Sequence, residues 1–377
     1  MSKPPVAKKE NVRRPQYSAD MRQRQLSLVG ASDPAVQRGE ARIQPGDAME
    51  FYAHWPSPTV IIADGPYGVS GFPGDPPTSD GLGDWYEPHV RAWADLAQPS
   101  TTLWFWNSEV GWAEVHPVLK ANGWQYAGAS IWDKGIGHIA GNVNSKSIRS
   151  FPVVSEVCVR YVRDVRLPTL DGQLLSMKEW LRYEWQRSGL PLTKTNEACG
   201  VRNAATRKYF TLDWRWYFPP PEMIERLAAY ATQHGQPTDV PYFSVDRISP
   251  ISGEQWKVMR AKWNHVHGIT NVWQEPALRG EERLRVDGRM KCVHLNQKPL
   301  KLMERIVAAA SDPGDVVWDP FGGLCSGAVA SMNLGGPVTS VAVSPDGQRF
   351  AAAGAHNAAR LWAAKDYQQL AEMKGEL

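Results

Sequence analysis

Asp64, Gly65, Pro66 and Tyr67 are the residues whose types and spacing could do chemistry. They follow residues 60–62, a β-branched apolar run typical of a strand that is buried on both faces of a parallel sheet. Gly65 and Pro66 end this strand, so Asp64 and Tyr67 are predicted at its carboxyl end, the edge of an α/β sheet where ligands bind. The same Asp-Gly-Pro is also ordinary turn chemistry.

This tetrapeptide resembles the D/N/S-P-P-Y/F/W motif of the amino-group DNA methyltransferases, with Gly65 in place of the first proline. The resemblance implies that Asp64 and the Gly65 carbonyl hydrogen-bond the exocyclic amine of adenine or cytosine, whose lone pair is otherwise delocalised into the ring. It also implies that Tyr67 stacks on a target base that has left the duplex. Pro66 would fix the turn.

A second stretch, residues 294–323, contains the other half of the resemblance. NQKPL is followed by an amphipathic helix over residues 301–311, a Pro-Gly turn, a strand over residues 315–318 and DPFGG. The glycines let the backbone approach a ligand closely. In the family these motifs bind S-adenosylmethionine. The resemblance therefore implies six cofactor-binding residues: Asp47 and Phe321 at the adenine, Lys298 and Pro299 at the methionine moiety, Asp319 at the amino group, and Gly323 in the glycine turn.

The order of the motifs predicts the fold. The catalytic motif comes first, a recognition segment next and the cofactor motif last, which is the permuted arrangement of the β group, and the resemblance covers about residues 40–335. We expect an α/β protein with a doubly wound, mostly parallel sheet of the S-adenosylmethionine-dependent methyltransferase type and a helical target-recognition module.

The family resemblance, together with changes in the sequence pattern, divides the chain into five expected segments. They are a flexible basic arm (1–38), the catalytic half of the methyltransferase domain (39–165), the target-recognition module (166–290), the cofactor-binding half (291–336) and an atypical tail (337–377).

The catalytic half has a clear apolar pattern. It predicts helices over residues 85–97 and 110–122 and strands over residues 101–106, 129–132 and 151–162.

Two short helices around Gly200, over residues 192–199 and 203–210, fit a helix-turn-helix. A helical hairpin that binds nothing and a solvated polar loop over residues 138–149 are the plain alternatives. Six residues are candidates for DNA contact: Lys146 and Arg149 in that loop, and Asn203, Thr206, Arg207 and Lys208, which the second helix is predicted to expose. The aromatic residues that follow are predicted to belong to the core, with a base-stacking platform as the alternative: Trp214, Trp216, Tyr217 and Phe218.

The tail does not fit the family. Residues 338–362 resemble one blade of a WD-repeat propeller, with an SPDG turn and a closing Leu-Trp, and one blade cannot bury its own faces. Either residues 338–343 pair as the sheet strand that follows the cofactor helix, with Asp346 as the ribose-binding acid, or that strand is lost and cofactor binding is weakened.

Composition limits the other choices. A net charge of +3 means that affinity for nucleic acid must come from local patches. The four cysteines form no C-x-x-C pair and follow no secretory signal, so we expect reduced thiols in a cytoplasmic protein and no metal site. Cys325 has no obvious His partner and is interpreted as a small packing residue. No apolar run is long enough to span a membrane.

The leading hypothesis is an adenine-N6 DNA methyltransferase acting on duplex DNA, because an Asp first in the motif is commoner among adenine enzymes of the family. Cytosine-N4 methylation, a DNA-binding protein without turnover, and an RNA or protein methyltransferase are the alternatives. A role in restriction-modification would add a cognate endonuclease as a partner. A homodimer is also compatible with the sequence.

Overall fold

The protein was analysed as a computed structural model, which describes residues 41–44, 47–70, 75–139, 149–279, 282–283, 297–334, 338–341, 349–354, 358–363 and 369–374. The predicted basic arm (1–38), Lys146 and Asp346 lie outside the described residues. In the part that is described, no helix has the length and apolar character needed to cross a membrane.

Eight strands form one sheet in the order β1-β10-β9-β2-β3-β5-β4-β8. β5 is antiparallel to both of its neighbours, and every other pair is parallel. The predicted mostly parallel sheet is therefore confirmed. The strands are β1 (Ala41–Gln44), β2 (Val60–Ala63), β3 (Thr102–Asn107), β4 (Trp124–Asp133), β5 (Ser155–Arg163), β8 (Val272–Gln274), β9 (Val317–Asp319) and β10 (Val338–Val341).

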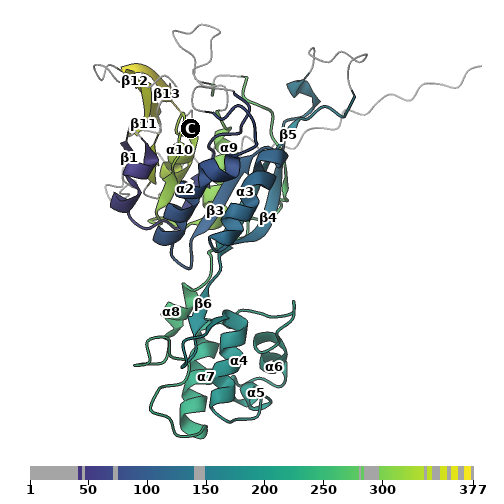
Figure 1. The fold of residues 1–377 in the computed structure, drawn as a ribbon, viewed down its shortest axis with the longest axis vertical. Coiled ribbons are helices and arrows are strands. Elements are labelled where there is room, and N and C mark those ends of the chain that lie inside the picture. The colour runs from purple at the N-terminus through teal and green to yellow at the C-terminus, as the bar shows by residue number, and fades with distance from the viewer. Residues whose placement is uncertain are drawn as a thin grey trace, which may run out of the picture.

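Helices cover both faces of this sheet (Figure 1). Val60 and Ile62 of β2 belong to the core under α9 and α10, whereas Ile61 and Ala63 belong to the core under α2 and α3. Successive side chains of a strand point to opposite faces, so one run of four buried apolar residues supplies two cores. The four helices are α2 (Leu82–Leu96), α3 (Glu109–Ala121), α9 (Leu300–Ala310) and α10 (Ser326–Asn333).

The elements predicted for the catalytic half are present with shifted ends. α2 begins three residues earlier than the predicted helix over residues 85–97, because Gly81 at φ +82° precedes its first turn. α3 ends before Gly123, which has a φ of +76°. β4 is much longer than predicted, since the strand passes through a register shift between Tyr126 and Gly128.

A separate helical unit follows β5, and we call residues 166–257 the helical module. It has its own aromatic core, which includes Trp180, Trp185, Phe210 and Trp256. Its elements are β6 (Arg166–Pro168), β7 (Leu174–Ser176), α4 (Met177–Arg187), α5 (Lys194–Ala198), α6 (Ala204–Tyr209), α7 (Pro221–His234) and α8 (Gly253–Lys257). α5 and α6 are the two short helices that the sequence predicts around Gly200.

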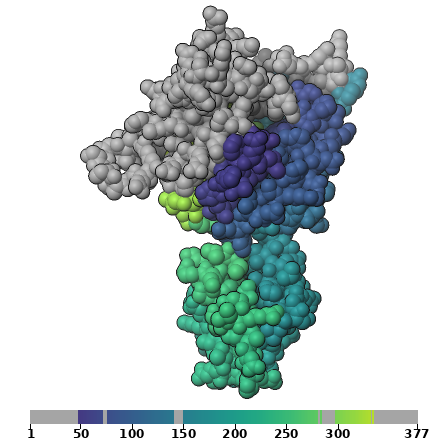
Figure 2. Space-filling model, turned by 60° about the vertical axis from the view of Figure 1, so that its left-hand side comes forward, coloured from purple at the N-terminus to yellow at the C-terminus, as the bar shows by residue number. Residues whose placement is uncertain are grey.

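The helical module lies at the sheet edge opposite Asp64. In β5, Val157 pairs with Asn107 at the carboxyl end of β3, and Val162 pairs with Thr102 at its amino end. β5 therefore leads the chain out at the amino edge of the parallel strands. Figures 1 and 2 show the helical module as a separate lobe beyond that edge.

The chain also returns at the amino edge. Lys262 forms an ion pair with Asp312, and Asn264 donates to the Ser311 carbonyl, in the turn that precedes β9. β8 then joins the central sheet beside β4. Within the segment 166–290 that is predicted as the recognition module, residues 262–279 thus pack with the central sheet.

The tail supplies the strand that the fold requires. β10 pairs in parallel with β9 on one side and with β1 on the other, so residues 338–341 form the predicted sheet strand and the loss of this strand is wrong. Residues 342–343 and Asp346, the predicted ribose-binding acid, lie outside the described residues. The rest forms a separate antiparallel sheet of β11 (Arg349–Gly354), β12 (Ala358–Ala363) and β13 (Gln369–Lys374).

Candidate active site

The catalytic and cofactor motifs meet at the carboxyl ends of two paired strands. β2 and β9 are neighbours in register, with Val60 beside Val317 and Ile61 beside Trp318. Asp64 follows β2 and Asp319 ends β9, so both carboxyl groups lie at the same edge. The predicted proximity of the two motifs is confirmed.

Gly65 is the point of closest approach between the motifs. A Cβ atom at this position would lie 2.8 Å from Cδ2 of Phe321 and 2.5 Å from the Tyr86 hydroxyl oxygen. Only glycine fits there, which explains physically why this chain departs from the first proline of the family motif. The next carbonyl, that of Pro66, accepts from the Tyr86 hydroxyl at 3.0 Å and from Asn107 Nδ2 at 2.9 Å.

Asp75 holds the turn that follows Pro66. Its Oδ1 accepts from the backbone N–H groups of Tyr67 at 3.0 Å and Gly68 at 2.8 Å, and its Oδ2 accepts from Val69 at 3.0 Å. Sequence reasoning missed this residue because the loop around it has no periodicity. An Asp among Gly and Pro residues was the available signal, since such a carboxylate commonly binds nearby backbone N–H groups.

A network of charges surrounds Asp64. Lys298 Nζ lies 2.8 Å from Asp64 Oδ1 and 3.4 Å from Glu156 Oε2. The Tyr67 hydroxyl is 3.0 Å from each of the same two oxygens, and Lys134 Nζ lies 2.5 Å from Glu156 Oε1. The two carboxylates and two ammonium groups balance, which stabilises charge in a site where the Lys298 side chain is only 2% exposed.

Burial and charge act against each other in this network. Burial raises the pKa of Asp64 despite the ion pair with Lys298. Burial also acts to raise the pKa of Glu156, but Lys298 and Lys134 outweigh it and hold this pKa below its usual value. Burial and the two carboxylates raise the pKa of Tyr67, which stays a neutral donor. Glu156 and Lys134 were not predicted as site residues, although the sequence places Glu156 where the family has His-Glu.

The cofactor half presents a buried acid and a set of aromatic rings. Asp319 is 4% exposed, and burial raises its pKa to about 8 although the backbone N–H groups of Phe321 and Gly327 donate to it. The Phe321 ring lies 5.1 Å from that of His89 and 5.8 Å from that of Trp85, between centroids. A buried carboxyl group fits a positively charged amino group, and aromatic rings fit a purine, so these residues fit the predicted cofactor.

The remaining predicted cofactor residues lie on the same edge. Asp47 follows β1 and caps the short helix η1 (Ala48–Glu50) by accepting from the Met49 N–H at 2.9 Å. Pro299 is buried at the N-cap of α9 beside Lys298. Gly323 has a φ of +52°, which favours glycine.

The predicted DNA-contact residues do not come together. Arg149 is exposed beside β5, whereas Asn203, Arg207 and Lys208 are exposed around α6 in the helical module, beyond the opposite edge. The prediction that Thr206 is exposed is wrong. Its hydroxyl is half-buried and bonds Thr195 Oγ1 at 2.7 Å and Asn196 Nδ2 at 2.8 Å, because it joins α5 to α6.

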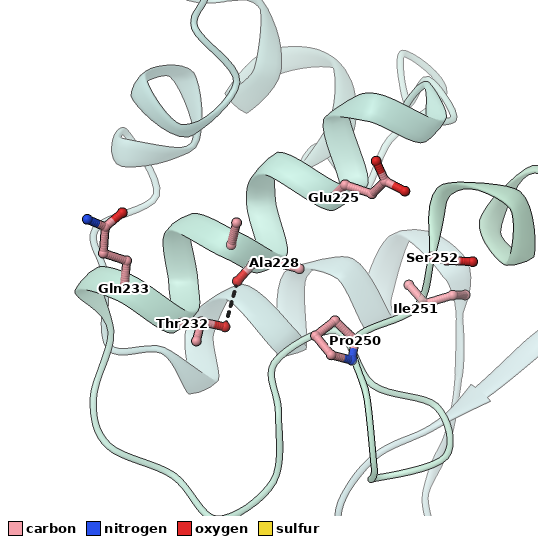
Figure 3. Close-up of a pocket in the computed structure, with 8 residues that line it drawn as sticks. Glu225, Ala228, Thr232, Gln233, Pro250, Ile251 and Ser252 are labelled. Carbon is pink, nitrogen blue, oxygen red and sulfur yellow. Dashed lines mark hydrogen bonds between the residues drawn. The ribbon is translucent and has the colours of Figure 1, made fainter.

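A hollow lies between α7 and residues 250–252 in the helical module (Figure 3). Glu225 is engaged there with the Gly253 N–H at 2.7 Å, and the Thr232 hydroxyl donates to the Ala228 carbonyl at 2.9 Å. In the part of the chain that the structure describes, no group of three or more His, Cys, Asp or Glu residues could hold a metal ion.

Similar proteins are known. Type II methyltransferase M1.MboII of Moraxella bovis is 35% identical over 100 residues, which are 26% of this chain and 38% of that protein. DNA adenine methyltransferase YhdJ of Escherichia coli K12 is 42% identical over 69 residues, 18% of this chain and 21% of that protein. The matched segments thus span well under half of either relative.

Among solved structures, the PvuII DNA methyltransferase, described as cytosine-N4-specific, is similar with a TM-score of 0.45 and 10% identity, covering 81% of this chain and 83% of that one. The sequence model of a family described as DNA methylase, N6_N4_Mtase, matches residues 59–338. This match includes β2, β9 and both motifs that meet at Gly65. The chain therefore belongs to the N6/N4 DNA methylase family.

Proposed function

We propose that this protein transfers a methyl group from S-adenosylmethionine to the exocyclic N6 amine of an adenine that has been flipped out of duplex DNA. The observation that carries the proposal is the contact of the catalytic motif with the cofactor motif at Gly65, at the ends of paired strands. S-adenosylmethionine is the cofactor of the family, and it supplies a methyl group activated on a sulfonium. The chain's own residues have to hold and polarise the amine.

Asp64 and Gly65 supply the acceptors. The Lys298 ammonium and the Tyr67 hydroxyl both donate to Oδ1 of Asp64, and neither of them donates to Oδ2. Asp64 Oδ2 and the Gly65 carbonyl can therefore accept the two amine hydrogens, which localises the nitrogen lone pair. The Lys298 ammonium lies 5.2 Å from the centre of the Tyr67 ring over one face, so the base stacks on the other face.

Asp64 also takes the proton that transfer leaves behind. After methylation the nitrogen is cationic and carries one proton too many. That proton passes to Asp64 Oδ2, and burial, which raises the pKa of Asp64, makes it a better acceptor than an exposed carboxylate. The Lys298 ion pair, 2.8 Å away, favours the ionised form of Asp64 that accepts this proton.

Two observations support adenine over cytosine. Asp stands first in the motif, and one relative is named a DNA adenine methyltransferase, although its match covers 69 residues. Cytosine-N4 methylation would use the same acceptors and is the second candidate. We further infer a cytoplasmic enzyme of restriction-modification or epigenetic marking, with duplex DNA as its partner.

Labelled cofactor incubated with duplex DNA, RNA and protein tests this function. We expect label in duplex DNA, and hydrolysis to nucleosides should yield N6-methyladenine. Asp64→Ala should abolish transfer and keep cofactor affinity, whereas the exposed Asp84→Ala should behave as wild type. Label in N4-methylcytosine would replace the base assignment, and label in none of the three polymers would contradict the enzymatic proposal.

A further inference from the structure

The helical module carries a surface that the catalytic proposal does not use. We call Arg202, Arg207, Lys208, Trp214 and Tyr217 the aromatic-basic surface. Trp214 is 91% exposed and Tyr217 64% exposed, so the prediction that both are core residues is wrong. Trp216 and Phe218 do pack against the core of the module. Two large aromatic side chains in one short segment are therefore largely in water, where their rings are available to a partner.

Backbone contacts hold this surface in shape. The Tyr217 N–H donates to the Lys208 carbonyl at 2.7 Å, and Trp216 Nε1 donates to the Tyr209 carbonyl at 3.0 Å, so the segment after α6 lies against that helix. The Trp216 N–H donates to the Asp213 carbonyl at 3.3 Å, which closes a turn with Trp214 at its tip. Because Trp216 packs against the core of the module, Trp214 at the tip of this turn faces the solvent.

The charge of this surface is positive. Two nearby acids are already paired, Asp213 with Arg215 and Glu197 with Lys194. Arg202, Arg207 and Lys208 form no ion pair with any residue that the structure describes. The Lys208 ammonium lies over the Tyr217 ring at 5.5 Å, so cation and aromatic face are adjacent. The complementary partner is a polyanion with flat apolar groups.

We propose that the aromatic-basic surface binds single-stranded nucleic acid. Cations would neutralise phosphates, and the exposed rings would stack on unpaired bases, which are not accessible in a paired duplex. This second site is separate from the base held at Asp64. β3 alone, with six residues, separates the two edges by about 20 Å at roughly 3.3 Å per residue, so this surface does not reach that base.

Fluorescence anisotropy with a short labelled oligothymidylate and the full chain tests this site. We expect Trp214→Ala to weaken binding about tenfold, as for loss of one stacked base. Removing Arg207 or Lys208 should lower the slope of log Kd against log salt by about 0.7 for each cation. The matched controls are Ile248→Ala, exposed elsewhere in the module, and Lys257→Ala on α8, and both should bind as wild type.

A competition experiment separates the two sites. A short unlabelled duplex, added in equal amount, should leave the oligothymidylate bound; displacement by the duplex would overturn the proposal. Wild-type affinity in Trp214→Ala would overturn it as well, and urea unfolding checks that this variant is folded. The inference does not depend on catalysis, since loss of methyl transfer with intact oligothymidylate binding would contradict the proposed function alone.

Discussion

The ammonium group of Lys298 lies 2.8 Å from the carboxylate of Asp64, which joins the cofactor motif to the catalytic motif across 234 positions of the chain. This pair also orients both partners of Tyr67, because Lys298 contacts Asp64 and Glu156 and the Tyr67 hydroxyl donates to the same two carboxylates. Its removal should therefore affect both charge and geometry.

Lys298→Met should destabilise the fold and abolish most transfer. The substitution keeps the length of the side chain but leaves two buried carboxylates with one remaining lysine, Lys134. Breaking a buried pair in this way costs about 3–5 kcal/mol. Urea unfolding measures the loss, and it should shrink toward low pH, where Asp64 and Glu156 become protonated. Lys301→Met, at a side chain that is 63% exposed, is the control; an equal effect in both variants would contradict a special role for Lys298.

Gly65→Ala should destabilise the protein even though the family motif has a larger residue at this position. The added Cβ would lie 2.5 Å from the Tyr86 hydroxyl and 2.8 Å from Phe321, so one of the two motifs has to shift. Overpacking of this kind costs about 1–3 kcal/mol, and cofactor affinity should fall because Phe321 is displaced.

Thermal unfolding and calorimetric titration with S-adenosylmethionine check the Gly65 prediction. Gly137→Ala is a matched control, because nothing lies within 4 Å of a Cβ atom built there. Combining Gly65→Ala with Tyr86→Phe removes the hydroxyl oxygen and should recover part of the stability. If Gly65→Ala binds cofactor and unfolds as wild type does, the close approach has no energetic consequence.

Asp75→Ala should impair transfer without touching the substrate. Three consecutive backbone N–H groups lose their acceptor, and an unsatisfied buried donor costs about 1–3 kcal/mol. The turn carrying Tyr67 should loosen, so kcat should fall more than cofactor affinity. The exposed Asp80→Ala in the same loop controls for loss of charge. Unchanged kcat in Asp75→Ala would show that the turn is held by other contacts.

The fold was more predictable from sequence than the site. The apolar run over residues 60–62 alone predicts a buried strand. The order of the two family motifs predicts the position of this strand in the sheet. Apolar periodicity reveals neither Asp75, which accepts from backbone N–H groups of its own loop, nor Glu156, whose partner Tyr67 is distant in sequence. The helical module shows the same limit: its helices could be predicted, but its place at the far edge depends on β5 running antiparallel to β3.

Asp319→Asn should make the cofactor-free protein less sensitive to alkaline pH. Burial raises the pKa of Asp319 from 3.8 to about 8, so folding favours its protonated form. The stability that this group contributes is fully present below about pH 4 and is lost as pH rises through about 8, with a slope of at most about 1.4 kcal/mol per pH unit. Asparagine cannot ionise, so the variant lacks this slope.

Urea unfolding of both proteins between pH 5 and 9 should therefore show their free energies of unfolding converging or crossing as the pH rises. Asp315→Asn, which removes an acid in the turn before β9, is the control, and its difference from wild type should not follow the Asp319 transition. Wild-type affinity for the cofactor's ammonium group should rise with pH over the same range, because binding favours the ionised carboxyl. A pH-independent difference between wild type and Asp319→Asn would contradict a raised pKa of Asp319. The backbone N–H groups of Phe321 and Gly327, together with the charge of Lys298, would then outweigh the effect of burial.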